Sequence, residues 1–175
     1  MKMTGLDRNR DAIMSISCFI TDADLNLLDM DGFDSIIHHE RARLDTMDEW
    51  CINTHGKSGL TQACIESTVR PEAAAASLLD YIKRFIPESR KGLLAGNSVH
   101  CDKEFLSKAP YSKVLEHLHY RILDVSSIKE AAKRWAPEQV LMAAPPKKGL
   151  HQAREDILES ISEARFYRNA FFHQA

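Results

Sequence analysis

The sequence of 175 residues lacks regularly spaced cysteines and an excess of positive charge, and each absence excludes some classes of protein. The four cysteines have no C-x-x-C spacing, so the sequence predicts neither a zinc site nor a disulfide framework. Reduced thiols of this kind favour an intracellular location. The 23 Lys and Arg residues against 25 Asp and Glu residues leave a formal charge of -2, which argues against a broad basic surface for long duplex nucleic acid.

Long apolar runs are also missing. No segment reaches the length of a membrane span, so we expect no membrane partner, and the first residues carry neither an apolar signal core nor an Arg-rich leader. Internal repeats and low-complexity segments are absent from the sequence as well. The length fits one domain over residues 1–175, with a single hydrophobic core.

Four short segments are typical of β-strands. The apolar, β-branched segment 13–21 and the segment 33–39 are separated by turn-forming residues, which favours an antiparallel pair. Segment 92–96 is apolar and flanked by glycine, which indicates a buried strand. Segment 119–124 alternates between polar and apolar residues, as a strand does.

Helical periodicity occupies most of the remaining chain. It predicts helices over 44–52, 60–65, 71–85, 102–106 and about 152–171. A further helix is capped by Ser126 or Ser127 and ends at Trp135, and a loop follows it at 136–148. Pro71 suits a first helical position, and the four alanines that follow favour the helix. Strands alternating with helices predict an α/β fold, in which helices flank a mixed sheet.

Three residues could carry metal-dependent phosphodiester chemistry, because two carboxylates and a neutral imidazole are its usual components. Asp102 follows a strand and the turn Gly96-Asn-Ser98, at a sheet edge where open α/β folds bind ligands. His151 and Asp156 would point about 140° apart on one helix, so we expect His151 to precede the helix start. Taken singly, Asp102 is equally typical of a helix cap, and Asp156 of a solvated charge.

The order of several short motifs along the chain is more specific than any one of them. The sequence contains, in turn, Met3-Thr-Gly-Leu-Asp7; Met47-Asp-Glu-Trp50 with Thr54-His55 and Ser58-Gly-Leu60; Gly96-Asn-Ser98 with Asp102; His119-Tyr-Arg-Ile-Leu-Asp-Val-Ser126; and Gly149-Leu-His-Gln-Ala153 with Asp156. This series resembles the oligoribonuclease family over essentially the whole chain. Members are 3′-to-5′ exoribonucleases of the DEDDh class with a ribonuclease-H-like fold. Without the resemblance, Trp50 would be read as a helix anchor and His55 as a loop histidine.

The resemblance implies a two-metal mechanism for cleaving short oligoribonucleotides, dinucleotides especially. It makes Asp102 and Asp156 ligands of Mg²⁺ or Mn²⁺, and His151 the general base. The substrate-binding roles that it implies are Leu6 and Trp50 on the terminal bases, His55, Ser98, Arg121 and Ser126 around the 5′ phosphate, and Tyr120 reaching the partner subunit of a homodimer.

The family's Asp-x-Glu motif, which would complete the metal site at the end of the first strand, is missing from this sequence. Lys2 stands at the Glu position. We therefore expect a domain whose first, central strand is absent from the chain, with impaired hydrolysis. Two origins stay open: a misassigned chain start, and an inactive homologue that binds short RNA or dimerises with an intact copy. A cytoplasmic or a mitochondrial location is compatible with either.

Overall fold

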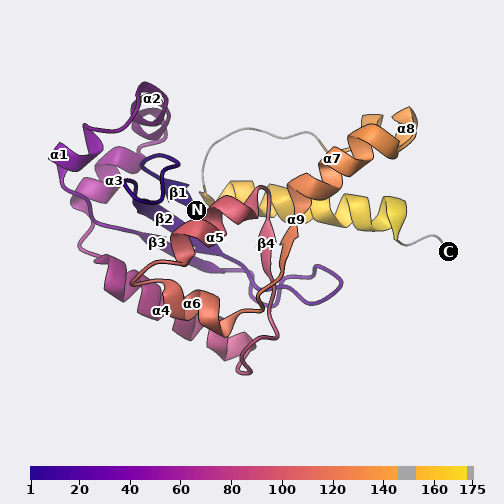
Figure 1. Ribbon diagram of the computed structural model, residues 1–175, viewed down its shortest axis with the longest axis horizontal. Helices are drawn as coiled ribbons and strands as arrows, with labels where there is room; N and C mark the ends of the chain where they lie inside the picture. Colours follow the sequence, from indigo (N-terminus) through magenta and orange to yellow (C-terminus); the bar gives the residue numbers. More distant parts are fainter. Residues whose placement is uncertain (146–152, 173–175) are drawn as a thin grey trace.

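The computed structural model describes residues 1–145 and 153–172, and within them the strands form two small sheets (Figure 1). Strands β1 (Lys2–Met3), β2 (Ile13–Cys18) and β3 (Phe33–Ile36) are antiparallel in the order β1-β2-β3. Strands β4 (Leu94–Gly96) and β5 (Ile122–Asp124) pair in parallel. The expected α/β class is confirmed, with the antiparallel and parallel pairings divided between two sheets.

Helices surround these sheets. Their bounds are α1 (Arg41–Leu44), α2 (Glu49–Lys57), α3 (Leu60–Glu66), α4 (Pro71–Phe85), α5 (Val99–Leu106), α6 (Ser112–His117), α7 (Val125–Trp135), α8 (Glu138–Met142) and α9 (Ala153–Phe171). Within the described ranges, none of these helices is long and apolar enough to cross a membrane.

The main core lies between the three-stranded sheet and helices α4, α5 and α6. Pro71 begins α4, as predicted, and the helix buries Leu78, Tyr81 and Ile82 against Ile16 of β2 and neighbouring residues. Each fully buried side chain of this size contributes about 1.5 to 3 kcal/mol to the stability of the fold. This core holds β2 and β3 in place, and β2 in turn carries β1.

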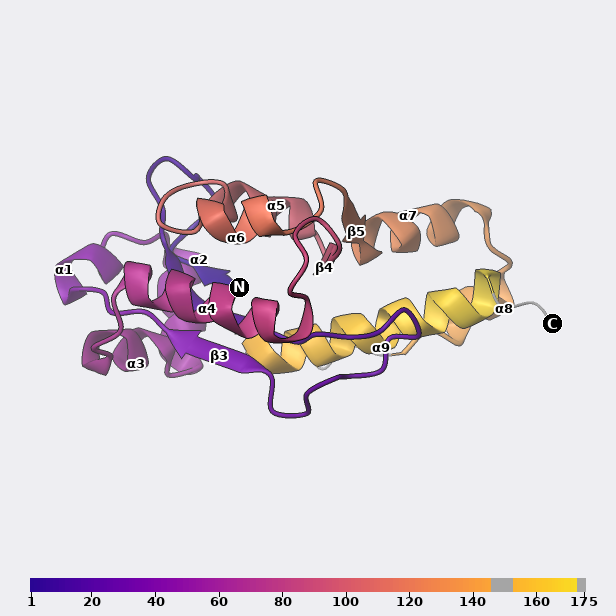
Figure 2. The same cartoon turned by 90° about the horizontal axis from the view of Figure 1, so that it is seen from below.

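Helix α9 extends from the three-stranded sheet to α7 (Figures 1 and 2). It packs on β2 near its beginning and on α7 further along, where Ala164 and Tyr167 join a second core with Val125 and Ala132. Its buried positions also include Ser160 and Glu163, whereas the predicted apolar residues Ile157, Leu158, Ile161 and Phe166 are only half-buried. Polar contacts, described below, explain why Glu163 faces inward.

Several predicted bounds were wrong. The segment 44–52 is not one helix, because α1 ends at Leu44 and Asp48 begins α2 by accepting a hydrogen bond from the Cys51 N–H at 2.7 Å. The predicted strands are shorter in the structure, and β4 is half-buried rather than buried. The predicted loop 136–148 contains α8. Helix α5 begins three residues before Asp102, so Asp102 is not its cap.

Candidate functional site

Two serines meet where the parallel strands β4 and β5 end. Ser98 precedes α5 with a φ of 52°, an uncommon conformation for a residue with a side chain. Its N–H donates to the Ser126 hydroxyl at 3.0 Å, and the two hydroxyl oxygens lie 3.2 Å apart. We call Ser98 and Ser126 the hydroxyl pair. The carboxyl ends of parallel strands are where open α/β folds bind ligands.

Asp124 holds the hydroxyl pair together. Its Oδ1 accepts hydrogen bonds from the N–H groups of Ser98 at 3.0 Å and Ser126 at 2.9 Å, and the second of these makes Asp124 the cap of α7. Ser126 and Ser127, the predicted caps, lie inside that helix. Burial raises the pKa of the Asp124 carboxyl, but hydrogen bonds from His100, Ser126 and Ser98 outweigh it, so the net pKa is below its ordinary value. Asp124 is therefore ionised at neutral pH.

A buried carboxylate supports the turn that leads to Ser98. Glu163 of α9 is 4% exposed, and its Oε2 accepts a hydrogen bond from the Asn97 side-chain amide at 2.8 Å. Its Oε1 lies 3.1 Å from the Lys129 ammonium of α7. A buried charge is tolerated when it is paired and hydrogen-bonded in this way. Glu163 thus ties α9 and α7 to the residue next to Ser98.

The two predicted metal-binding carboxylates contact Met1 and Lys2, at the beginning of the chain. Lys2 Nζ donates to Asp156 Oδ2 at 2.6 Å, with the lysine side chain 15% exposed and the aspartate 37%. The Met1 amino group donates to Asp102 Oδ1 at 3.0 Å. We call Asp102 and Asp156 the acidic pair. An internal cation, Lys2, therefore pairs with Asp156, and His151, the predicted base, lies outside the described residues.

The predicted base-stacking residues are on the surface. Leu6 is 76% exposed and Trp50 is 60% exposed, so Trp50 is not the buried helix anchor of the simpler interpretation. His55 lies inside α2 rather than in a loop, is 2% exposed, and has Nε2 3.0 Å from the Met3 carbonyl oxygen. The Trp50 and His55 ring centroids are 6.3 Å apart. Met3 is three residues before Leu6, so this contact ties α2 to the segment that carries Leu6.

Tyr120 and Arg121 contact each other on an exposed segment before β5. The Arg121 guanidinium lies 5.0 Å from the centroid of the Tyr120 ring, which in turn stacks on His119 at 4.5 Å. Tyr120 is 62% exposed. Of the four predicted phosphate-binding residues, the structure joins Ser98 to Ser126 by a hydrogen bond. Arg121 contacts the Tyr120 ring, and His55 contacts the Met3 carbonyl oxygen.

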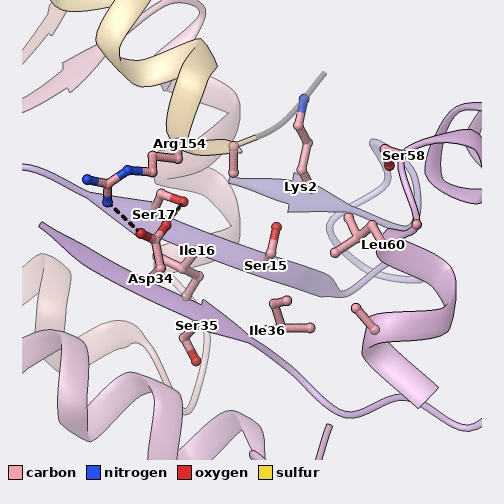
Figure 3. A pocket seen from close by; sticks show the side chains of 13 residues that line it. Lys2, Ser15, Ile16, Ser17, Asp34, Ser35, Ile36, Ser58, Leu60 and Arg154 are labelled. Atoms are coloured by element: carbon pink, nitrogen blue, oxygen red, sulfur yellow. Dashed lines mark hydrogen bonds and ion pairs between the residues drawn. The ribbon is translucent and has the colours of Figure 1, made fainter. Parts of the chain in front are cut away.

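A cavity of about 300 Å³ opens on the three-stranded sheet (Figure 3), and its lining includes neither Ser98 nor Ser126. Ser15, Ser17 and Asp34 line its floor, and Lys2 and Arg154 stand at its sides. The Arg154 guanidinium donates to Asp34 Oδ2 at 2.8 Å and to the Met30 carbonyl oxygen at 3.0 Å. Asp34 also accepts a hydrogen bond from the Ser17 hydroxyl. The charged groups of Asp34 and Arg154 in this cavity are therefore already paired within the protein.

Comparison with known proteins agrees with this α/β architecture. The sequence profile described as Exonuclease (RNase_T) matches residues 3–164, which defines the class as an exonuclease. The chain is 47% identical over 168 residues to the probable oligoribonuclease of Schizosaccharomyces pombe, covering 96% of this chain and 65% of that protein. It is 48% identical over 174 residues to the mitochondrial oligoribonuclease of Mus musculus (98% and 71% covered) and 44% identical over 174 residues to the oligoribonuclease of Pseudoalteromonas translucida (99% and 93%). The chain belongs to the oligoribonuclease family.

Exonuclease domains generally use divalent metal ions, and the acidic pair of this chain does not fit a two-metal site. Two such ions carry four positive charges, while Asp102 and Asp156 supply two negative charges, and the Lys2 ammonium already pairs with Asp156. Among the residues that the structure describes, no three His, Cys, Asp or Glu side chains form a group that could hold a metal.

Sequence reasoning missed three residues around the hydroxyl pair. Asp124 was treated only as the end of a strand, although an Asp directly before a helical segment is a common cap signal. His100, whose Nδ1 is 3.1 Å from Asp124 Oδ2, carried no signal of its own. Glu163 could not have been found, because it contacts a residue 66 positions away and periodicity gives no reason for an acidic side chain to be buried.

Proposed function

We propose that this chain binds short oligoribonucleotides, dinucleotides especially, as a member of the 3′-to-5′ exoribonuclease class whose own hydrolytic activity is impaired. The observation that carries the proposal is the hydroxyl pair, held by an ionised Asp124 at the end of the parallel strands. The hydrogen bond between the two hydroxyls uses one of their two protons, so the pair retains a second proton for a phosphate oxygen. The oligoribonuclease relatives support short RNA as the ligand.

Exposed apolar side chains supply the other end of the proposed site. Leu6 and Trp50 have faces open to solvent, and stacking on an aromatic ring contributes about 1 to 3 kcal/mol per base. The His55 ring lies 6.3 Å from that of Trp50, and Arg121 supplies a positive charge on the exposed segment before β5. Because a few local groups suffice to hold a dinucleotide, the proposal is compatible with a net charge of -2.

Impairment follows from the acidic pair. The Lys2 ammonium lies 2.6 Å from Asp156, where an acidic ligand would stand in the family pattern. In this arrangement a metal ion must compete with an internal cation for the same oxygen. His151 remains the proposed general base. With Mg²⁺ or Mn²⁺ supplied in solution, we expect slow turnover at most.

The second candidate function is an inactive homologue that binds short RNA or dimerises with an intact copy. Tyr120 favours a role at a subunit contact, because its ring is 62% exposed and stacks on His119. The relatives include mitochondrial and bacterial proteins, which supports an intracellular location for this chain, cytoplasmic or mitochondrial.

A binding and cleavage assay tests the proposal. A fluorescently labelled, 5′-phosphorylated diribonucleotide is titrated with the chain in EDTA and then in Mg²⁺, and product is followed over time. We expect binding in both solutions and little product. Ser126→Ala should weaken binding about tenfold, since a hydrogen bond to a charged group is lost. Ser77→Ala, on the exposed side of α4, is the matched control and should bind as the wild type does.

Two results would contradict the proposal separately. Rapid, Mg²⁺-dependent release of mononucleotides would overturn the impairment while leaving the ligand class intact. Absence of dinucleotide binding, with the chain folded by circular dichroism, would overturn the ligand class. Binding without cleavage in the presence of an added intact relative, and formation of a mixed dimer, would favour the second candidate.

A further inference from the structure

The segment between β1 and β2 forms a closed loop that carries Leu6. The Thr4 N–H donates to the Ala12 carbonyl oxygen at 2.9 Å, and the Ala12 N–H donates to the Thr4 hydroxyl at 3.1 Å. We call residues 4–12 the Leu6 loop. Thr4 is 4% exposed, whereas Leu6 is 76% exposed. The two ends of the loop are therefore joined and anchored in the protein, while the apolar Leu6 side chain faces solvent.

Asp11 closes this loop from within. Its Oδ1 accepts a hydrogen bond from the Thr4 hydroxyl at 2.9 Å, and its Oδ2 accepts one from the Asp7 N–H at 2.9 Å. The carboxylate also lies so close to Gly5 that a side chain at that position would collide with it. Because Gly5 and Asp7 are the neighbours of Leu6, one carboxylate fixes the backbone on both sides of that residue.

Two cationic side chains hold the same loop from outside. Lys108, which follows α5, donates from Nζ to the Arg8 carbonyl oxygen and to Asn9 Oδ1, both at 2.7 Å. Arg43 of α1 donates to the Arg10 carbonyl oxygen at 2.7 Å. These donors come from segments far apart in the sequence. They therefore fix the loop relative to the body of the molecule.

A preformed loop increases what an exposed apolar side chain can contribute to binding. An exposed leucine alone needs no explanation, since many occur on protein surfaces. Leu6 differs because the backbone on both sides of it is held by side-chain hydrogen bonds before any ligand arrives. Binding then loses less free energy to the ordering of the loop, so more of the apolar contact appears as affinity.

We propose that Asp11 is a positioning residue that sets Leu6 in the orientation in which it meets a nucleobase, with Lys108 as an outer support. This inference rests on the proposed function and deepens it, since it assigns part of the affinity for a base to the preformed Leu6 loop. Asp11 acts through Leu6 rather than on the ligand. Its loss should therefore weaken dinucleotide binding only while Leu6 is present.

The test is a double-mutant cycle between Asp11 and Leu6, measured by calorimetry with a 5′-phosphorylated diribonucleotide in EDTA so that no ligand is cleaved. We expect Leu6→Ala to weaken binding about tenfold, since an apolar contact is lost. Asp11→Asn should weaken binding about fivefold, because an amide keeps an acceptor at only one of the two oxygen positions and the loop loosens. In the Leu6→Ala background the same change should cost less than about twofold.

Lys108→Met tests the outer support in the same two backgrounds. Its hydrogen bonds are exposed, so their removal should leave the fold intact. We expect a loss of about twofold that disappears in the Leu6→Ala background. Asp80→Asn on α4 and Lys113→Met on α6 are the matched controls, because both residues are exposed, and both variants should bind as the wild type does.

The outcomes separate this inference from the proposed function. If Asp11→Asn costs the same in both backgrounds, or costs nothing in the wild type, the inference is overturned and the proposed function stands. The same holds if Leu6→Ala binds as well as the wild type. If Asp11→Asn does not fold, as judged by circular dichroism, Lys108→Met decides by the same criterion. If the wild type binds no dinucleotide, the proposed function fails and this inference fails with it.

Discussion

Ser98 directly precedes α5 and Asp102 lies in its first turn, yet the hydroxyl pair and the acidic pair differ in what they offer a ligand. Ser98 and Ser126 are fixed by an ionised Asp124, and the hydrogen bond between their hydroxyls uses one of the two hydroxyl protons. Asp156 of the acidic pair is bound to the Lys2 ammonium of β1. In the proposed function the first pair accepts a phosphate, whereas the second already holds an internal cation. Substrate binding and metal binding can therefore be tested separately.

Removing the support of the hydroxyl pair should have the largest effect. Glu163→Ala leaves the Asn97 amide and the Lys129 ammonium without their buried acceptor. We expect the free energy of unfolding to fall by about 3 kcal/mol, as when one partner of a buried ion pair is removed. Urea unfolding followed by circular dichroism measures the loss, and affinity for a 5′-phosphorylated dinucleotide should fall with it.

Two variants sharpen this result. Glu163→Gln keeps an acceptor for Asn97 and should lose less stability than Glu163→Ala. Glu104→Ala, on the exposed side of α5, should change stability by no more than about 0.5 kcal/mol. Equal losses in Glu163→Ala and Glu104→Ala would show that the buried network does not support the hydroxyl pair.

Reversing the charge of Lys2, which pairs with Asp156, should allow the acidic pair to bind a metal ion. Lys2→Glu places a third carboxylate near Asp156, so the variant should be less stable than the wild type in EDTA and gain stability from Mg²⁺. The gain should reach about 1.4 kcal/mol when Mg²⁺ is at ten times its Kd. Thermal unfolding with and without Mg²⁺ measures it.

The wild type and Lys91→Glu are the references for this prediction. Lys91 pairs with Glu88 on the surface, with its side chain 69% exposed, so reversing it should create no metal response. A wild type that Mg²⁺ stabilises as strongly as Lys2→Glu would mean that the internal cation does not block the acidic pair.

Arg154 offers a way to disturb the acidic region alone. It joins the beginning of α9, two residues before Asp156, to Asp34 and the Met30 carbonyl oxygen, and its guanidinium lies 4.7 Å from the centroid of the Phe19 ring. Since both partners of the ion pair are partly exposed, Arg154→Ala should cost about 1 kcal/mol of stability.

Dinucleotide binding distinguishes this variant from those of the hydroxyl pair. Arg154→Ala should bind a 5′-phosphorylated dinucleotide as the wild type does, because Arg154 contacts Asp34 and the Met30 carbonyl oxygen and the cavity beside it is not lined by Ser98 or Ser126. A loss of affinity as large as that of Ser126→Ala would contradict the independence of the hydroxyl pair and the acidic pair.

The smallest expected effect concerns pH. The pKa of Asp124 is lower in the folded protein than its ordinary value of 3.8, so its stabilising contribution is fully present above that value. The contribution is lost as pH falls through the lower, folded pKa. The stability difference between the wild type and Asp124→Asn should therefore shrink between about pH 5 and about pH 2. Urea unfolding at several pH values measures it, and a constant difference would contradict an ionised Asp124.

The sequence predicted well those helices that are determined by neighbouring residues, such as a first-turn proline or regular apolar spacing. Helix α4 begins at Pro71 and ends at Phe85, as expected from the proline, the alanines and the apolar spacing. Signals of the same kind were overlooked at Asp48 and Asp124, which cap α2 and α7. Helix α8 was missed because it follows Pro137 in a segment rich in proline, where the short run of helix formers was given too little weight.

The sequence by itself determined the family, the α/β class and the absence of the Asp-x-Glu motif, because these are properties of residue identity and order. Only the tertiary structure decided that Lys2 pairs with Asp156, 154 residues away, and that Asp124 joins His100 to the hydroxyl pair. Hydrogen bonds and ion pairs act over about 3 Å. Which groups come that close depends on how the strands and helices pack, and no periodicity or motif records it.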